Sequence, residues 1–172
     1  MGGPHSGTPV AASSLVLGPN LLPFGIMGER LRQVLGTFPS SYQILPTYPC
    51  AIDQNSQPIN MMEEENWLAD AQRPFLRAAR QFRQELGSRY SVPTVSVFGY
   101  GIPTVAGLHV QRDSSGQWVQ VSYENKPSGD NTIPERSAVL PQTKIHPVSQ
   151  HHGSLYVDND VKMRLKLELS RG

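Results

Sequence analysis

The segment that most constrains the fold is a short β-rich run at residues 94–98, Thr-Val-Ser-Val-Phe. Pro93 precedes this run, and Gly99-Tyr100-Gly101-Ile102-Pro103 ends it sharply. A run this short and this apolar is typical of a parallel strand that is buried on both faces. Because helices cover the faces of parallel sheets, the run and the helical patterns around it predict a mixed helix–strand chain of the α/β class.

The longest helical pattern extends from Glu63 to Tyr90. Pro74 either divides this helix or marks a first turn, and Gly87 is expected to end it. Beyond the proline, apolar residues recur at helical spacing and predict one buried stripe, formed by Phe75, Ala79, Phe82 and Leu86. The opposite face carries Arg73, Arg77 and Arg80. Such a face is either a solvated surface or a contact for anionic lipid headgroups.

Shorter elements flank this helix. Helices are expected around Val10–Leu17 and at Gly28–Leu35, and a short strand is expected at Lys144–Val148. Leu108–Arg112 and Trp118–Tyr123 flank the turn Asp-Ser-Ser-Gly, which predicts a β-hairpin. Residues 37–60 show no steady period and predict a long irregular excursion, a kind of segment that is often functional.

The tail, Asp160–Leu169, fits two patterns. Its apolar residues alternate with charged ones, which favours a strand. Val161, Leu165 and Leu169 also fit helical spacing, and Asp158 or Asn159 could cap such a helix. Periodicity alone favours the strand.

Composition sets the class of protein and excludes several functions. The 172 residues are enough for one compact domain, and 15 glycines with 15 prolines indicate many loops. A net charge of +1 gives no reason to expect nucleic acid as a partner. Cys50 is the single cysteine, so a disulfide within the chain and a cysteine-rich metal site are excluded.

The sequence gives little information about location or cofactors. The first residues lack the basic and apolar regions of a signal peptide, and no apolar run is long enough to span a bilayer. Localisation is therefore undetermined, with the cytoplasm as the default expectation. His5, His109 and His146 show no metal-ligand spacing with one another. We expect neither a metal nor an organic cofactor.

Two residues match the chemistry of acyl transfer. Asp130 lies in the loop Ser-Gly-Asp-Asn-Thr-Ile-Pro, after the strand-like runs, and His152 follows it within a His-His pair. An acid followed by a histidine, late in a mixed chain, matches the Ser…Asp…His order of α/β-hydrolases. Two plainer interpretations stay open: an ordinary Asx-turn aspartate and a surface histidine pair.

The nucleophile of such a triad is not evident. The strained elbow Gly-x-Ser-x-Gly needs glycines two residues before and two after the serine, and no serine of this sequence has both. Ser6 has Pro4 and Thr8 at these positions. Ser114 lies in the predicted hairpin turn, and Cys50 lacks a strand before it and a helix after it. We therefore expect this chain alone to be catalytically silent.

Five segments in order resemble one family of lipid-acting enzymes. They are Gly2–Pro9, the Ser-Tyr-Gln-Ile-Leu-Pro segment at 41–46, Val97–Thr104 with its Gly-x-Gly-Ile-Pro-Thr ending, Gly129–Ile133, and His152. Together they resemble the lecithin:cholesterol acyltransferase family of α/β-hydrolases, whose Gly-Asp-Gly-Thr-Val loop carries the catalytic aspartate. Here Asn131 takes the place of a glycine, and asparagine tolerates left-handed backbone angles better than most residues.

The resemblance implies that residues 1–172 are a single partial domain, the C-terminal half of an α/β-hydrolase fold with a β-hairpin. In this half Asp130 would orient the histidine, and His152, or His151 if the alignment shifts by one, would be the general base and acid. The resemblance also implies a lid-like excursion at 37–75 and a helical tail.

The function implied is that of the C-terminal portion of a serine-type lipid acyltransferase or esterase without its nucleophile. Its partner in the intact enzyme would be a lipid or another ester, with peripheral membrane contact as a further expectation. Two alternatives stay open. One is a non-catalytic lipid- or partner-binding module that uses the arginine face, and the other is one chain of a two-chain hydrolase.

Overall fold

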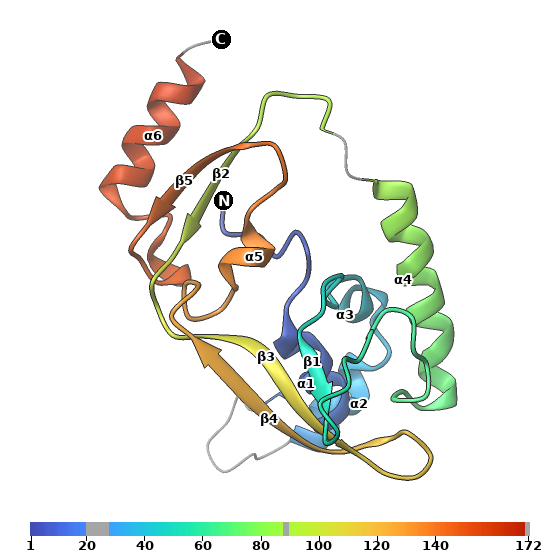
Figure 1. Cartoon of the computed structure of the whole chain (residues 1–172). Helices are drawn as coiled ribbons and strands as arrows, with labels where there is room; N and C mark the ends of the chain where they lie inside the picture. The colour runs from blue at the N-terminus through green and yellow to red at the C-terminus, as the bar shows by residue number, and fades with distance from the viewer. Residues whose placement is uncertain (20–27, 88–89, 171–172) are drawn as a thin grey trace. The chain divides into compact units, whose positions relative to one another are not determined.

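The computed structural model describes residues 1–19, 28–87 and 90–170, in which helices are mixed with two small sheets (Figure 1). This mixture is compatible with the predicted α/β class. The chain separates into two compact units. The first unit comprises Met1–His5, Tyr90–Val105 and Asn125–Gly172, and the second comprises Ser6–Arg89 and Ala106–Glu124. The expectation of a single partial domain stays a prediction.

A two-stranded parallel sheet forms the centre of the first unit. Strand β2 (Val95–Gly99) pairs with β5 (Lys144–Val148), so that Val95 lies opposite Lys144 and Gly99 opposite Val148. The run that predicted a buried parallel strand is therefore confirmed, with its bounds shifted by one residue. The predicted strand at residues 144–148 is also confirmed.

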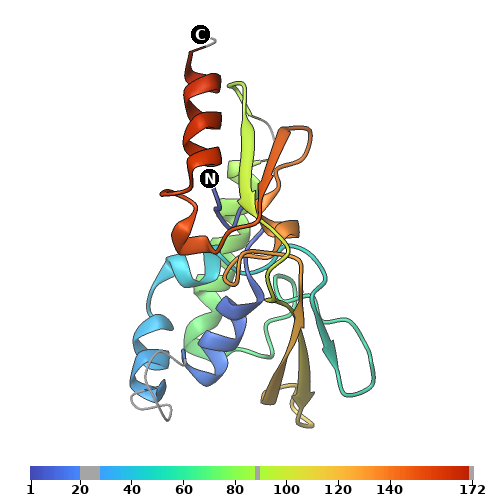
Figure 2. The ribbon, with the colours of Figure 1, turned by 90° about the vertical axis from the view of Figure 1, so that its left-hand side faces the viewer.

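Helices cover both faces of this sheet. Val97 packs with Val148, Leu155 and Val161, and Val161 belongs to α6 (Asn159–Leu169). The ribbon of α6 lies beside β2 and β5 (Figures 1 and 2). The next residue, Phe98, packs with Ile133 and with Ala138 of α5 (Glu135–Ala138). Successive residues of a strand point to opposite faces, and apolar residues at both positions therefore require a cover on each side.

The tail is the helix α6, so the strand favoured by periodicity is wrong and the helix implied by the resemblance is confirmed. Asp158 caps it, because its carboxylate accepts hydrogen bonds from the N–H groups of Asp160 (2.9 Å) and Val161 (3.1 Å). Val161 is buried, whereas Met163 and Leu167 are 58% and 46% exposed. A half-buried strand would bury all of its alternating apolar residues on one face, and the apolar residues of this tail do not form such a face.

A three-stranded sheet in the order β1-β3-β4 belongs mostly to the second unit, while the first two residues of β3 and the last two of β4 belong to the first. Its strands are β1 (Ala51–Asp53), β3 (Thr104–Arg112) and β4 (Trp118–Lys126), and β1 runs parallel to β3. The predicted hairpin is confirmed, and a hydrogen bond from the N–H of Asp113 to the carbonyl of Gln117 (3.0 Å) closes its loop. The prediction that residues 37–60 are wholly irregular is wrong, because β1 and a short helix lie within them.

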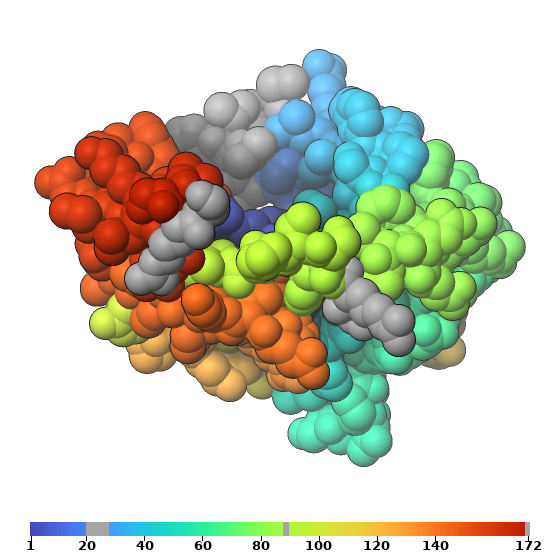
Figure 3. All heavy atoms as spheres, turned by 90° about the horizontal axis from the view of Figure 1, so that it is seen from above, coloured from blue at the N-terminus to red at the C-terminus, as the bar shows by residue number. Residues whose placement is uncertain are grey.

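The helices of this unit are α1 (Pro9–Leu17), α2 (Gly28–Leu35), α3 (Pro39–Gln43), the 3₁₀ turn η2 (Asp70–Gln72) and α4 (Arg73–Leu86). The first two confirm the predicted helices. Atoms of α3 and α4 lie against each other (Figure 3). Between them the rings of Tyr42 and Phe75 stack with centroids 5.4 Å apart, and the Tyr42 hydroxyl donates to the carbonyl of Gly36 at 2.8 Å. Burial raises the pKa of Tyr42 to about 12.

The long helix is shorter than its sequence pattern predicted. It begins at Arg73, so the part predicted at residues 63–69 is wrong, and Pro74 lies in the first turn. Gly87 ends the helix, as predicted, with a φ of 63°. The buried residues are Leu76 and Ala79, whereas Phe82 and Leu86 are 38% and 59% exposed. The predicted stripe is therefore wrong in its second half.

Acidic groups of the same unit partner the arginine face. Glu65 accepts from Arg77 at 2.7 Å and from Arg80 at 3.0 Å, and Arg73 pairs with Asp70 at 2.9 Å. The hydrogen bond from Arg77, with the charge of both arginines, lowers the pKa of Glu65 to about 2. These arginines therefore tie α4 to the segment that precedes it. Residues 37–75 contribute buried side chains such as Leu45, Ile59 and Trp67, and their lid-like role stays a prediction.

No helix within residues 1–19, 28–87 and 90–170 has the length and apolar character needed to cross a membrane.

Replacing Glu65 by Gln should destabilise the second unit in a pH-dependent way. The pKa of Glu65 rises from about 2 in the folded chain to its ordinary value of 4.5 on unfolding. Because the folded value is the lower one, the ion pairs stabilise the fold above pH 4.5, and this contribution is lost as the pH falls toward 2. The difference in unfolding free energy between wild type and Glu65→Gln should therefore shrink over this range in urea titrations.

Glu63→Gln is the matched control, because the Glu63 side chain is not the partner of Arg77 or Arg80. A Glu65→Gln difference that stays constant down to pH 2 would contradict this role of the ion pairs.

Candidate functional site

The structure brings the predicted acid and histidine together. The Nδ1 atom of His152 lies 2.9 Å from Oδ2 of Asp130, which is hydrogen-bonding distance. The Asp130 side chain is 1% exposed and that of His152 is 40% exposed. The acid is therefore sealed inside the first unit, while its histidine partner remains partly open to solvent.

The loop that carries Asp130 is held by the carboxylate itself. Oδ1 accepts hydrogen bonds from the N–H groups of Thr132 (3.0 Å) and Ile133 (2.7 Å), which is an Asx-turn arrangement. The Asx-turn interpretation of Asp130 is therefore confirmed for one of its oxygens, while the other oxygen faces His152. Asn131 has a φ of 75°, so the residue that stands in the place of a glycine adopts the left-handed conformation.

Thr104 fixes the same loop from the neighbouring segment. Its side-chain oxygen accepts from the N–H of Asn131 at 2.8 Å and donates to the carbonyl of Ile102 at 2.8 Å. The threonine is buried, with 1% of its surface exposed. Gly129 provides the space, since a Cβ atom there would lie 2.6 Å from the Thr104 Oγ1. Thr104, the last residue of the Val97–Thr104 motif, therefore holds the loop that carries Asp130, a role that the sequence did not reveal.

The loops that carry Asp130 and His152 converge on the carboxyl end of β2. The last residue of this strand is Gly99, where an added Cβ atom would lie 2.3 Å from the Gln150 carbonyl oxygen and 2.4 Å from the Cβ of Asp130. The N–H of His152 donates to the Asp130 carbonyl at 2.9 Å, which joins the two loops directly. In open α/β sheets, sites form at the carboxyl ends of the strands, and this pair occupies that position.

Gly2 lies beside the ring of His152. The N–H of Gly2 donates to the carbonyl of Val97 at 2.8 Å, and Gly2 has a φ of 57°. A Cβ atom on Gly2 would lie 2.9 Å from Cδ1 of Leu155 and 3.5 Å from Cε1 of His152. Gly2, the first residue of the predicted small-residue segment, therefore packs directly beside His152.

The geometry favours His152 over His151. His151 is exposed and precedes the 3₁₀ turn η3 (His152–Ser154), and no hydrogen bond or ion pair joins its ring to Asp130 in the part of the chain that the structure describes. The alternative assignment to His151 therefore lacks the contact that an acid–histidine pair requires. Sequence order alone could not separate two adjacent histidines.

The weak nucleophile candidates all belong to the second unit. Ser114 lies in the hairpin loop between β3 and β4, and the Ser6 carbonyl accepts from the N–H of Thr47 at 3.0 Å. Cys50 directly precedes β1, and its carbonyl accepts from the N–H of Leu108 at 2.7 Å. Across residues 1–19, 28–87 and 90–170, no group of three His, Cys, Asp or Glu residues is arranged to hold a metal ion.

Comparison with known proteins adds no assignment. A scan against protein-family models and a search of curated proteins both find no match to this chain.

The arrangement has a definite chemical capacity. A carboxylate bound to Nδ1 fixes the imidazole orientation and favours the tautomer whose Nε2 is free to accept a proton. The same carboxylate stabilises the imidazolium once that proton has been taken. The pair can therefore activate a hydroxyl or thiol placed beside Nε2.

Replacing Gly99 by Ala should disrupt the site and the fold together. The new methyl group would overlap the Gln150 carbonyl and the Asp130 side chain, so one of the two loops must move. We expect a loss of about 1–3 kcal/mol in the free energy of unfolding, which denaturant titration measures. The contact between His152 and Asp130 should lengthen, as a crystal structure of the variant would show.

Gly153→Ala is the control. Gly153 is also next to His152, but a Cβ atom there would have no neighbour within 4 Å among the described residues. If both variants have the same stability as wild type, the close packing at Gly99 does not hold the loops.

Proposed function

We propose that this chain supplies the acid and the histidine of a serine-type acyl-transfer site, as the C-terminal portion of a lipid acyltransferase or esterase of the α/β-hydrolase fold. In this proposal Asp130 orients the imidazole. His152 takes a proton from a serine hydroxyl as it attacks an ester carbonyl, and then returns the proton to the leaving alcohol. The resemblance to the lecithin:cholesterol acyltransferase family suggests a lipid ester as the substrate.

The observation that carries the proposal is the contact between Asp130 Oδ2 and His152 Nδ1 at 2.9 Å. Its setting adds support. Two backbone N–H groups hold the other carboxylate oxygen, the acid is buried, and the histidine is partly open. A histidine that only filled space in a core would not need this asymmetric exposure. A general base must reach its substrate proton, and partial exposure permits that.

The proposal requires a nucleophile from polypeptide other than these 172 residues. One edge of β2 is a suitable place for it to approach. The N–H of Tyr100 donates to the Val148 carbonyl, so the N–H and C=O groups of even-numbered residues in β2 face β5. Val97 is odd-numbered, and its carbonyl faces the opposite edge of β2, where it accepts from the N–H of Gly2. A parallel strand that runs along this second edge would end beside the His152 ring, where Gly2 now lies.

The two alternatives differ in their support. A two-chain hydrolase agrees with the same geometry, and mixing with the second chain would restore activity. A non-catalytic lipid-binding module would use Arg73, Arg77 and Arg80, but carboxylates of the chain already pair with these groups. Ion pairing leaves less positive charge for anionic headgroups, and we therefore favour the acyl-transfer site.

We expect the chain alone to hydrolyse no p-nitrophenyl ester and to take no label from a fluorophosphonate probe, because it lacks a serine in an elbow. Labelling at Ser6 that Ser6→Ala abolishes would contradict the proposal. The matching positive test is made on the longest open reading frame that contains this chain, or on a mixture with a second chain that carries Gly-x-Ser-x-Gly.

In that complete system the probe should label the elbow serine. Asp130→Ala and His152→Ala should each reduce ester turnover by at least about 10³-fold. His151→Ala should leave it close to wild type, because that ring does not meet the acid. Equal losses in the two histidine variants would contradict the assignment of the base.

A further inference from the structure

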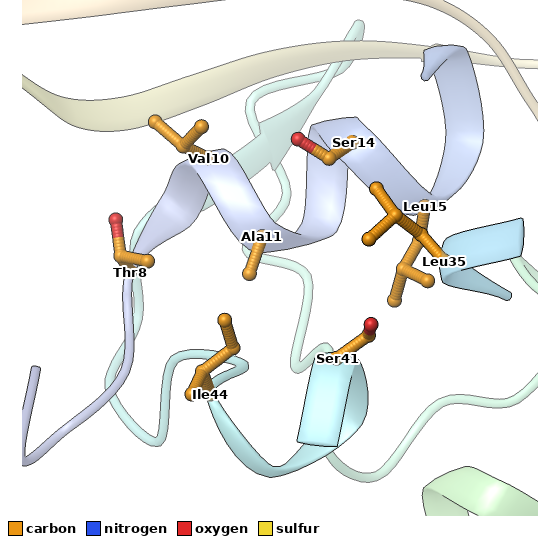
Figure 4. A pocket seen from close by; sticks show the side chains of 8 residues that line it. All are labelled: Thr8, Val10, Ala11, Ser14, Leu15, Leu35, Ser41 and Ile44. Atoms are coloured by element: carbon orange, nitrogen blue, oxygen red, sulfur yellow. The ribbon is translucent and has the colours of Figure 1, made fainter. Parts of the chain in front are cut away.

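A pocket of about 210 Å³ lies in the second unit, and neither Asp130 nor His152 is among its lining residues. Figure 4 shows Ala11 of α1 and Ile44, which follows α3, pointing toward each other, with Leu15 of α1 and Leu35 of α2 close together beside them. Its apolar lining consists of Val10, Ala11, Leu15, Leu35 and Ile44. The pocket therefore has the chemistry of a binding site for aliphatic groups.

The pocket has a closed floor and an open mouth. Leu15 is 1% exposed and Ala11 is 8% exposed, so these two residues of α1 form the buried floor. Val10 and Ile44 are 38% and 40% exposed and stand at the mouth. An apolar group that enters would cover these exposed side chains as well as its own surface, and both contributions favour binding.

Among the described lining residues, the polar side chains are the hydroxyls of Thr8, Ser14 and Ser41. The Ser41 hydroxyl is directed toward the space between α1 and α3 (Figure 4). Among the described residues that line the pocket, none has a charged side chain. A charged ligand group would enter without a counter-charge, which is costly, so the part of the ligand inside the pocket must be neutral.

The volume of the pocket limits the size of the ligand. A dry aliphatic cavity of about 150 Å³ in another protein holds benzene, and pockets for drug-sized ligands range from about 300 to 1,000 Å³. At about 210 Å³ this pocket is too small for a sterol ring system or for both chains of a phospholipid. It is large enough for a single short alkyl segment, and the described lining residues include no aromatic side chain that would favour a flat ring.

We propose that this pocket between α1, α2 and α3 binds one alkyl chain of an amphiphile, with the polar end of the amphiphile at the open mouth. The proposal uses neither Asp130 nor His152. Its test therefore fails or succeeds independently of the proposed acyl-transfer function.

The test is an amide NMR titration of the whole chain with the straight-chain alcohols from butanol to decanol. We expect saturable shifts at Ala11, Ser14 and Leu15. Each added CH₂ should lower the Kd about fourfold until the pocket is full, after which the Kd should level off within the series. Shifts that do not saturate, or a Kd that falls without levelling while shifts spread over the surface, would overturn the proposal.

Ala11→Met is the main variant, because its flexible side chain would fill the pocket from the floor. It should weaken octanol binding by at least about tenfold. Ala78→Met is the matched control, since Ala78 is exposed on α4 and does not line the pocket. Binding to Ala11→Met that equals wild type would overturn the proposal.

Ile44→Ser tests the mouth without adding bulk to the interior, and it serves if Ala11→Met is poorly folded by circular dichroism. It should weaken octanol binding about three- to tenfold, and unchanged binding would overturn the proposal. A further titration uses monomeric dioctanoyl-phosphatidylcholine. Shifts at the same amides would show that the bound alkyl chain can belong to a glycerolipid. Shifts with the alcohols alone would show that it belongs to a free single-chain amphiphile.

Discussion

The buried carboxylate of Asp130 is the group on which the first unit depends. A carboxylate removed from water costs several kcal/mol unless hydrogen bonds replace the lost solvent. Here the N–H groups of Thr132 and Ile133 satisfy one oxygen, and the ring of His152 satisfies the other. The same three contacts shape the loop, bring the histidine to the end of the sheet and set the orientation of its ring. Stability and chemical capacity therefore arise from one small set of hydrogen bonds.

Small residues make this arrangement possible. Gly99 lets two loops approach the end of β2, and Gly2 leaves space beside the imidazole. Thr104 binds the backbone N–H of Asn131, whose left-handed conformation reverses the direction of the loop that carries Asp130. Larger side chains at either glycine would meet backbone or side-chain atoms within about 3 Å. The glycines of this region thus leave the space in which a buried carboxylate and a partly exposed imidazole meet at the end of a parallel strand.

The sequence predicted the elements whose pattern depends on local chemistry, such as β2, the hairpin and the cap of a terminal helix. It predicted the pairing of Asp130 with a histidine from their order and from a family resemblance. The sequence did not predict features of the structure that depend on pairing and burial rather than on local pattern. The alternation in residues 160–169 favoured a strand, although the cap at Asp158 and the burial of Val161 produce a helix. The three residues of β1 carry too little pattern to identify a strand that is defined by its pairing with β3. The arginine face of α4 gave no sign of its acidic partner Glu65, which lies twelve residues before Arg77.

The most direct test of the central claim is the tautomer of His152, measured by ¹⁵N NMR of its imidazole nitrogens at a pH where the ring is neutral. If Asp130 holds Nδ1, the proton should reside on Nδ1 in the wild-type chain. In Asp130→Asn it should move to Nε2, because the variant can present an N–H group where the carboxylate oxygen stood while its carbonyl oxygen keeps the loop contacts. A proton on Nε2 in both proteins, or the same spectrum before and after the exchange, would contradict the account.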